Sequence, residues 1–150
     1  MSVHRATIDW QRVAHASAAS TYSRNHKAML AGQSVAVSAS PEYQGDPECA
    51  DPEQLLLTAL ASCHLLTFLA IAEIQGYRVE SYRDTPVAHL EKNAAGRMAV
   101  TRIELSPEVR FAGEKRPDAA ALAKLHDSAH RNCFIASSIT ARVTVNPATS

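Results

Sequence analysis

The sequence predicts an α+β fold: a sheet with a long central buried helix and a second, shorter helix, assembled as an intertwined homodimer. Two patterns carry this prediction. One apolar run between Asp51 and Gly76 has the end signals of a single helix, and a shorter amphipathic run follows it much later in the chain. Segments that alternate between apolar and polar residues surround both runs, as in strands with one face in water.

The long helix is predicted to begin after Asp51 and to end at Gly76. Asp51 suits an N-cap, Pro52 suits the first helical position, and Gly76 suits a left-handed C-cap. Almost every residue from Leu55 to Ala72 is apolar, so the helix has no polar face and needs cover on all sides. About 20 apolar residues would also span a bilayer, but the polar residues inside this run favour a core helix.

The length of this helix leads to the prediction of a homodimer. At 1.5 Å per residue, a helix of this length spans about 36 Å. One small sheet and one short helix cannot cover an apolar surface of that length on every side. A second copy of the chain would cover it if the two long helices pack together between two sheets.

The remaining elements follow from period-two alternation and from turn and cap residues. The tetrapeptide Asn93–Gly96 predicts a hairpin turn, and Pro117 precedes a second helix from about Asp118 to Arg131. The predicted strand segments are 6–13, 33–40, 87–92, 97–100, 101–111 and 139–145.

Length and composition limit the classes of function. The 150 residues contain no linker or repeat, which predicts one domain over residues 1–150. Fifteen basic and fifteen acidic residues cancel, so neither nucleic acid nor a membrane is expected as a partner. The first residues lack a signal-peptide pattern, which predicts a cytoplasmic protein. Thiols stay reduced in that compartment, so Cys49, Cys63 and Cys133 favour redox or metal chemistry over a structural disulfide.

Cys63, in the middle of the long apolar run, and Cys133 together indicate a thiol enzyme. A cysteine in such a run is often only a small buried hydrophobe, and that reading stays open. As a nucleophile, Cys63 would have to be a thiolate, which needs a cation beside it. A guanidinium is suited because it stays charged and its planar fork can donate to the sulfur and to a bound substrate together.

Several short motifs resemble one known family, the osmotically inducible and organic hydroperoxide resistance proteins (OsmC/Ohr). The resemblance spans essentially the whole chain, and its most specific element is the acidic residue ten positions before the cysteine. The motifs that carry it are Tyr22-Ser-Arg-Asn-His26, Asp51-Pro-Glu-Gln-Leu-Leu, Ala61-Ser-Cys-His, Leu90-Glu-Lys-Asn and Ala129-His-Arg-Asn-Cys133.

The resemblance implies a cysteine-dependent peroxidase for organic hydroperoxides, with its active site at the interface of an intertwined dimer. It implies that Cys63 is the attacking thiol and Cys133 the resolving one. It further implies that Glu53 is the carboxylate that orients an arginine, for which Arg24 is the best match. No cofactor is expected.

The chemistry of such a site predicts the remaining roles. Attack leaves a sulfenic acid on Cys63, which condenses with a nearby thiol to a disulfide. Cys133 is the candidate partner, because Cys49 lies in a loop close to Glu53. An apolar lining from Leu60, Leu66 and Phe134 would favour an alkyl or lipid-like hydroperoxide over hydrogen peroxide. A small dithiol or a redox protein is expected as the reductant.

The spacing of Glu53 and Cys63 adds a geometric expectation. Ten residues of unbroken helix separate two Cα atoms by about 15 Å and leave them some 80° apart around the axis. The two side chains could then not meet around one guanidinium. Either the helix is broken between Gln54 and Ser62, or the partner chain supplies the carboxylate, and we favour the second.

Two other classes of function remain open. His126, His130 and Cys133 stand at i, i+4 and i+7 of the second helix and could bind zinc with a fourth ligand from elsewhere. The chain could also be a binding module that has the fold without turnover.

Overall fold

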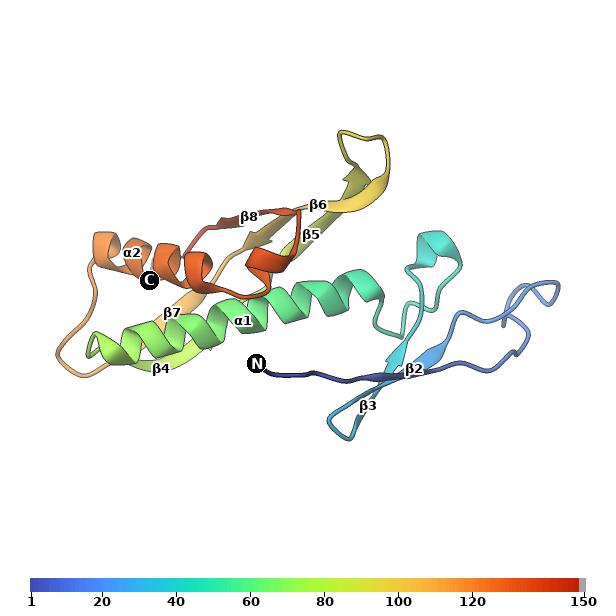
Figure 1. Ribbon diagram of the computed structural model, residues 1–150, viewed down its shortest axis with the longest axis horizontal. Helices are drawn as coiled ribbons and strands as arrows, with labels where there is room; N and C mark the ends of the chain where they lie inside the picture. Colours follow the sequence, from blue (N-terminus) through green and yellow to red (C-terminus); the bar gives the residue numbers. More distant parts are fainter. Residues whose placement is uncertain (149–150) are drawn as a thin grey trace. The chain divides into compact units, whose positions relative to one another are not determined.

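The structure of the protein is a computed structural model, and it describes residues 1–148 (Figure 1). The chain divides into two compact units, Met1–Leu55 and Leu56–Ser150, and each is described by itself. A single domain over residues 1–150 therefore stays a prediction, and its last two residues lie outside the described part of the chain.

The first unit contains a three-stranded antiparallel sheet in the order β1-β2-β3. Its strands are β1 (Thr7–Asp9), β2 (His26–Leu30) and β3 (Gln33–Val37). A two-residue turn joins β2 to β3, and both of its residues, Ala31 and Gly32, have positive φ angles of 48° and 81°. That backbone suits the right-handed twist of a hairpin. A short 3-10 helix, Pro41–Tyr43, follows the sheet.

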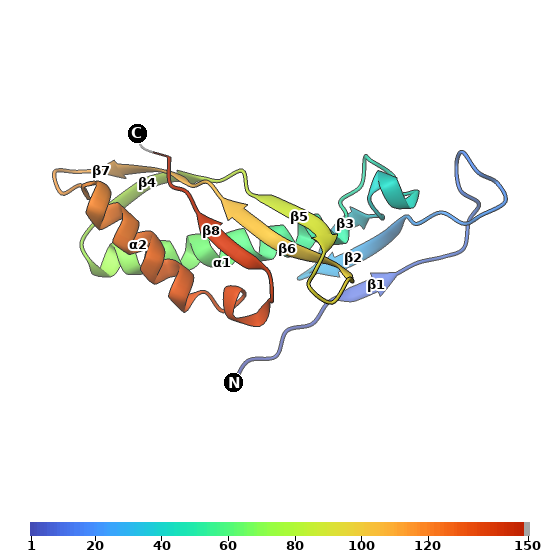
Figure 2. The same ribbon diagram turned by 90° about the horizontal axis from the view of Figure 1, so that it is seen from above.

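The second unit holds two small sheets, which Figure 2 shows from above. One pairs β4 (Arg78–Arg83) with β7 (Glu108–Ala112) in antiparallel fashion. The other has the order β5-β6-β8, from β5 (Val87–Lys92), β6 (Met98–Leu105) and β8 (Arg142–Val145). The predicted hairpin is confirmed, since β5 and β6 pair antiparallel across Asn93–Gly96, whereas β8 runs parallel to β6.

The long helix α1 (Pro52–Ile74) is confirmed as one unbroken element of 23 residues. Its start has a capping box: Asp51 Oδ1 accepts a hydrogen bond from the Gln54 N–H at 2.7 Å, and Gln54 Oε1 accepts one from the Asp51 N–H at 3.0 Å. Gly76, with φ of +78°, lies just past its end, where a left-handed residue is needed.

The second helix, α2 (Ala119–Asn132), also agrees with the sequence prediction to within one residue at each end. Asp118 is its N-cap, and its carboxylate accepts a hydrogen bond from the Ala121 N–H at 2.8 Å. Its buried residues Leu125, His126 and Ala129 form one face. Cys133 follows the helix directly as its C-cap.

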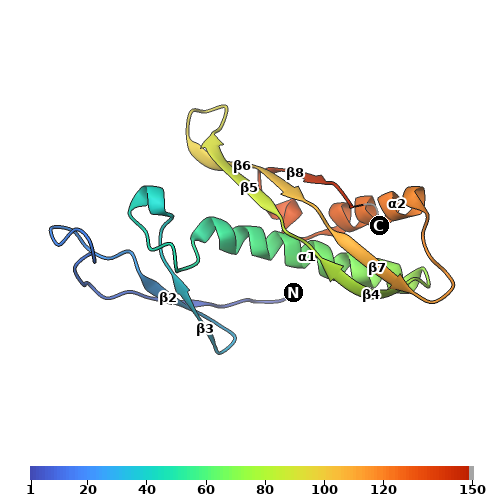
Figure 3. The same cartoon turned by 180° about the vertical axis from the view of Figure 1, so that it is seen from behind.

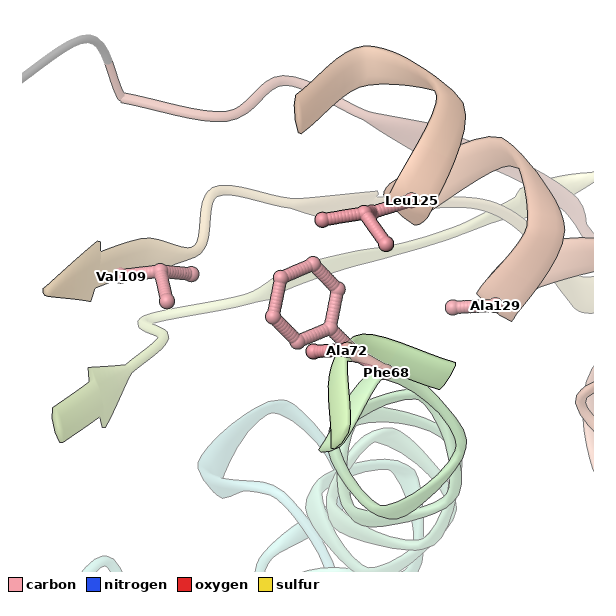
Figure 4. Close-up of a cluster of buried hydrophobic side chains, with 5 residues drawn as sticks. All are labelled: Phe68, Ala72, Val109, Leu125 and Ala129. Carbon is pink, nitrogen blue, oxygen red and sulfur yellow. The ribbon is translucent and has the colours of Figure 1, made fainter. Parts of the chain in front are cut away.

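Two clusters of buried apolar side chains form the core of the second unit. In the first, Phe68 and Ala72 of α1 meet Val109 of β7 and Leu125 and Ala129 of α2 (Figure 4). Figure 3 shows the same end of α1 beside β4 and β7. The second cluster lies nearer the N-terminal end of α1 and contains Leu60, Ile103, Leu105 and Cys133, with Cys63 packed against it.

A large part of α1 is not covered within one chain. Only 22% of its most apolar 18-residue stretch is buried. Among the described residues, α1 is the one helix long and apolar enough to cross a membrane by length and composition, a test that a core helix of a soluble protein also passes. Five of its exposed residues recur every three or four positions along one face: Ala59, Ser62, Leu66, Ala70 and Ile74.

Candidate active site

The two cysteines that are seventy residues apart in the sequence lie next to each other in the second unit. Cys63 is half-buried in the middle of α1, and Cys133 is fully buried at the end of α2. The thiol of Cys133 donates a hydrogen bond to the Cys63 sulfur. The chain after Cys133 turns tightly, because the Ser137 N–H donates to the Cys133 carbonyl oxygen at 3.1 Å.

This turn gives Cys63 two main-chain hydrogen-bond donors. Burial by itself raises the pKa of the Cys63 thiol, but the N–H groups of Ile135 and Phe134 and the Cys133 thiol all donate to its sulfur. The Thr67 hydroxyl, which also bonds the Cys63 carbonyl oxygen at 2.8 Å, adds a smaller contribution. The net effect is a pKa of Cys63 below its usual value, so the thiolate is favoured.

Cys133 has the opposite electrostatics. Burial raises the pKa of its thiol, and the neighbouring Cys63 raises it further, although the Ala136 N–H donates to its sulfur at 3.4 Å. Cys63 therefore ionises more readily than Cys133. One thiolate and one neutral thiol in hydrogen-bond contact are the two partners that a disulfide-forming cycle requires.

The apolar residues predicted to line the site differ strongly in exposure. Leu60 is only 1% exposed and packs behind Cys133, whereas Leu66 and Phe134 are 65% and 82% exposed. Leu60 therefore backs the thiol pair, and the two exposed residues present apolar surface to the outside of the chain.

Arg24 belongs to the first unit. Its guanidinium lies over the Tyr22 ring, 4.3 Å from the centroid, and donates to Gln44 Oε1 at 2.7 Å and to the Tyr22 carbonyl oxygen. It lines a pocket of about 400 Å³ with mostly apolar walls, and the other lining residues are Trp10, Tyr22, His26, Ser38, Ala39 and Pro52. No carboxylate pairs with Arg24 in the part of the chain that the structure describes.

Glu53 also lies in the first unit, half-buried in the first turn of α1. Because α1 is continuous from Pro52 to Ile74, the sequence alternative of a break between Gln54 and Ser62 is excluded. The structure thus brings Cys63 and Cys133 together within one chain, and it does not join Glu53 to Arg24 as an ion pair among its described residues.

The zinc site considered from the sequence is not formed in the described part of the chain. Across residues 1–148, no group of three His, Cys, Asp or Glu side chains is placed to hold a metal ion, so His126, His130 and Cys133 are not assembled as ligands.

Cys49 is half-buried in the first unit. Burial and the adjacent Asp46 carboxylate raise the pKa of its thiol, which keeps it protonated.

A buried pair of histidines beside the thiols was not predicted. His64 Nε2 and His126 Nδ1 lie 3.1 Å apart in a hydrogen bond, with the two rings nearly parallel and 1% and 2% of each residue exposed. The His126 ring also stacks on Phe68 at 4.4 Å between centroids. Burial, and then the charge of neighbouring histidines, lowers the pKa of each to about 4, so both are neutral.

Each histidine of this pair keeps one nitrogen without a partner: His64 Nδ1 and His126 Nε2. A buried polar atom left unsatisfied costs about 1–3 kcal/mol. The sequence held a signal for the pair, because both histidines occupy positions of apolar faces, His64 between Leu60 and Phe68 on α1 and His126 beside Leu125 on α2.

The chain is similar to a known protein family and to solved structures. The family model described as OsmC-like protein matches residues 45–148 of the chain. No curated protein sequence matches the chain. An OsmC-like protein of unknown function from Vibrio cholerae O1 biovar eltor str. N16961 is 40% identical, with a TM-score of 0.91 over 99% of this chain and 100% of that one.

More distant structures share the fold. An organic hydroperoxide resistance protein from Elizabethkingia anophelis, with thiocyanate bound, has a TM-score of 0.76 at 13% identity, covering 100% of this chain and 98% of that one. The organic hydroperoxide resistance protein OhrB of Bacillus subtilis has a TM-score of 0.71 at 14% identity, covering 97% and 98%.

Proposed function

The chain belongs to the OsmC-like protein family, and from this membership we propose that it is a cysteine-dependent peroxidase that reduces organic hydroperoxides. The observation that carries the proposal is the hydrogen bond between Cys63 and Cys133, with the pKa of the first lowered and that of the second raised. Two structures with the same fold are named organic hydroperoxide resistance proteins, which agrees with this substrate class.

The proposed cycle has three balanced steps. The Cys63 thiolate attacks the outer oxygen of ROOH, the O–O bond breaks, and the leaving alkoxide takes a proton to become ROH, while Cys63 becomes a sulfenic acid. The Cys133 thiol attacks that sulfur, and the sulfenic oxygen leaves as water as the disulfide forms. A small dithiol or a redox protein then reduces the disulfide to two thiols and is itself oxidised.

Arg24 and Glu53 complete the proposal as the group that orients the peroxide. The Arg24 guanidinium contacts neutral acceptors and an aromatic ring, and it forms no ion pair with a carboxylate among the described residues. Glu53 stands ten residues before Cys63 on an unbroken helix. We therefore propose that Arg24 and Glu53 act on the Cys63 of a partner chain.

A homodimer is part of the same proposal. The exposed face of α1 contains small and apolar residues at helical spacing, which lets a second helix approach closely. Leu66 and Phe134, exposed in one chain, would then line the substrate pocket at the interface. The neutral net charge supports a protein without nucleic acid or an anionic membrane as partner, and cytoplasmic location stays part of the proposal.

A thiol count tests the proposal directly. The reduced protein should lose two thiols per chain after one equivalent of cumene hydroperoxide, and Cys63→Ser should consume none. Cys133→Ser should react once and stop as a sulfenic or sulfinic acid, and Cys49→Ser, the matched control, should behave as the unchanged protein. Hydroperoxide consumption by Cys63→Ser would overturn the assignment, and no thiol loss in the unchanged protein would favour a binding module.

A further inference from the structure

The hydrogen bond between His64 and His126 connects the two helices that carry the thiol pair. His64 directly follows Cys63 on α1, and His126 precedes Cys133 by seven residues at the end of α2. Over residues 1–148, it is the one hydrogen bond between side chains within α1 and α2, and the thiol contact involves Cys133, the C-cap just past α2. The other contacts between these helices include the stacking of the His126 ring on Phe68 and the apolar cluster of Phe68, Leu125 and Ala129.

Helix geometry relates the two contacts. Seven residues are almost two full turns and about 10 Å of rise, so His126 and Cys133 lie on the same face of α2. This face carries a histidine contact at one point and the thiol contact two turns later. Two such points fix both the rotation of α2 about its axis and its position along α1.

Disulfide formation needs such a fixed position. A disulfide requires Cβ atoms roughly 3.5–4.5 Å apart and a narrow range of torsion angles. Apolar contacts such as those of Leu125 and Ala129 permit small slides of one helix along another, because they have no direction. A hydrogen bond between two ring nitrogens is directional and breaks when the helices slide by about 1 Å.

The pair is not explained by stability alone. Both histidines are almost fully buried in apolar surroundings, and each leaves one nitrogen without a partner. Two well-packed apolar side chains would remove these unsatisfied atoms and are expected to make the protein at least as stable. A role in fixing register is the best-attested use of such a buried polar contact.

We propose that the hydrogen bond between His64 and His126 is a positioning contact that sets the register of α2 on α1 so that the Cys133 sulfur reaches the oxidised Cys63 sulfur. The inference rests on the proposed two-cysteine cycle. His64 and His126 are positioning residues in it, because neither is assigned a contact with the substrate or with the reacting sulfur atoms.

The decisive variant replaces both histidines by leucine. His64→Leu with His126→Leu keeps similar volumes and removes both unsatisfied nitrogens, so its melting temperature should equal or exceed that of the unchanged protein. Its Cys63 should still be oxidised by cumene hydroperoxide within about twofold of the normal rate. Disulfide formation should be at least about tenfold slower, because a misplacement of about 1 Å can cost up to 100-fold in rate.

Conservative variants separate the hydrogen bond from the ring. His126→Asn places an amide atom where Nδ1 was, and His64→Gln does the same for Nε2. Each should keep disulfide formation within about threefold of normal, measured by rapid quenching with dimedone and N-ethylmaleimide and by mass spectrometry. Normal disulfide formation in the double leucine variant would overturn the proposal, as would equal slowing in the conservative and leucine variants.

A second measurement does not depend on peroxide. Oxidised dithiothreitol exchanges with the two protein thiols, forming the Cys63–Cys133 disulfide and reduced dithiothreitol. The equilibrium for the double leucine variant should be at least about tenfold less favourable to the protein disulfide, which is about 30 mV in reduction potential. If the unchanged protein does not react with hydroperoxide, the peroxidase proposal fails. The equilibrium with dithiothreitol still tests whether the two histidines position the thiols. An unchanged equilibrium would overturn the positioning role.

Discussion

At Cys63 the strongest stabilising donor of the thiolate is a main-chain group. The Ile135 N–H is the largest of the contributions that lower the pKa of Cys63, ahead of the Cys133 thiol and the Phe134 N–H. These donors come from the turn after α2, so the end of that helix both holds the resolving thiol and activates the attacking one.

Ile135→Pro tests this donor by removing its N–H. Ile135 has φ of −68°, which the proline ring adopts naturally, although the ring also restricts the backbone of Phe134 before it. The pH midpoint of Cys63 alkylation should rise, because the thiolate loses its best donor. Ile135→Ala, which also loses side-chain volume but keeps the N–H, is the matched control, and an equal rise in both variants would contradict the main-chain role.

The two buried histidines predict a pH dependence of stability. Their pKa values are about 4 in the folded protein and about 6.5 when unfolded, so the unfolded state binds more protons between these values. The free energy of unfolding should therefore fall as the pH drops from 6.5 towards 4, by up to about 1.4 kcal/mol per pH unit for each histidine that titrates.

Urea unfolding between pH 7 and pH 4.5 measures this dependence. The double leucine variant at positions 64 and 126 carries neither titrating group, so its stability should vary less over the same range. A slope equal to that of the unchanged protein would show that other groups cause the acid sensitivity.

At the level of residues, the sequence identified the thiol pair but not its electrostatics. Cys63 and Cys133 could be chosen because thiols are rare and their motifs are distinctive. The Ile135 and Phe134 donors could not be predicted, since every residue except proline has an N–H. Only the conformation of the turn after α2 directs these two N–H groups to the Cys63 sulfur. The roles of Arg24 and Glu53 stay predictions, because their proposed partner belongs to another chain.

At the level of elements, the continuity of α1 decides how a carboxylate can reach the site. Glu53 and Cys63 are on one unbroken helix, about 15 Å apart along its axis. The proposal that Glu53 acts on the Cys63 of a partner chain follows from this separation.

Mixing inactive chains tests this arrangement. Cys63→Ser and Glu53→Ala chains, each inactive alone, should recover peroxidase activity when they are unfolded together and refolded as heterodimers. About half of the normal activity per heterodimer is expected, since one of its two sites is complete, and about a quarter for a mixture that pairs at random. Heterodimers shown by mass spectrometry to form without activity would contradict a shared site, and refolded single variants are the controls.

The elements themselves could be predicted where local signals were strong. The caps at Asp51 and Asp118 and the turn at Asn93–Gly96 specify α1, α2 and the hairpin β5–β6. The segment 101–111, predicted as one strand, is two strands of different sheets separated at Ser106 and Pro107. Strands β2 and β4 were missed, because their residues lack clear alternation and their pairing depends on distant partners.

At the level of the whole molecule, the exposed apolar face of α1 is the main unsatisfied feature of a single chain. Leu66 and Ile74 on this face are 65% and 85% exposed. Burying such residues contributes about 25 cal/mol for each Å² removed from water. The fold class is confirmed by the family and its structures, and the homodimer stays a prediction that this surface supports.

Thermal unfolding at different protein concentrations checks the dimer. For a dimer that unfolds to two chains, a tenfold rise in concentration should raise the melting temperature by roughly 2 °C, from mass action and typical unfolding entropies. Ala70→Glu, on the exposed face of α1, should give a monomer in solution without disturbing the helix. A melting temperature independent of concentration, with a monomer in solution, would contradict the dimer.

The complete burial of Cys133 has a further consequence for the unknown electron donor. In the Cys63–Cys133 disulfide, only the Cys63 sulfur is open to attack from outside, so the donor must form its mixed disulfide with Cys63. In Cys133→Ser, oxidation leaves a sulfenic acid on Cys63 that the donor's thiol can also attack. This variant, oxidised and then treated with a monothiol such as glutathione, should therefore carry a single mixed disulfide, on Cys63, that dithiothreitol releases.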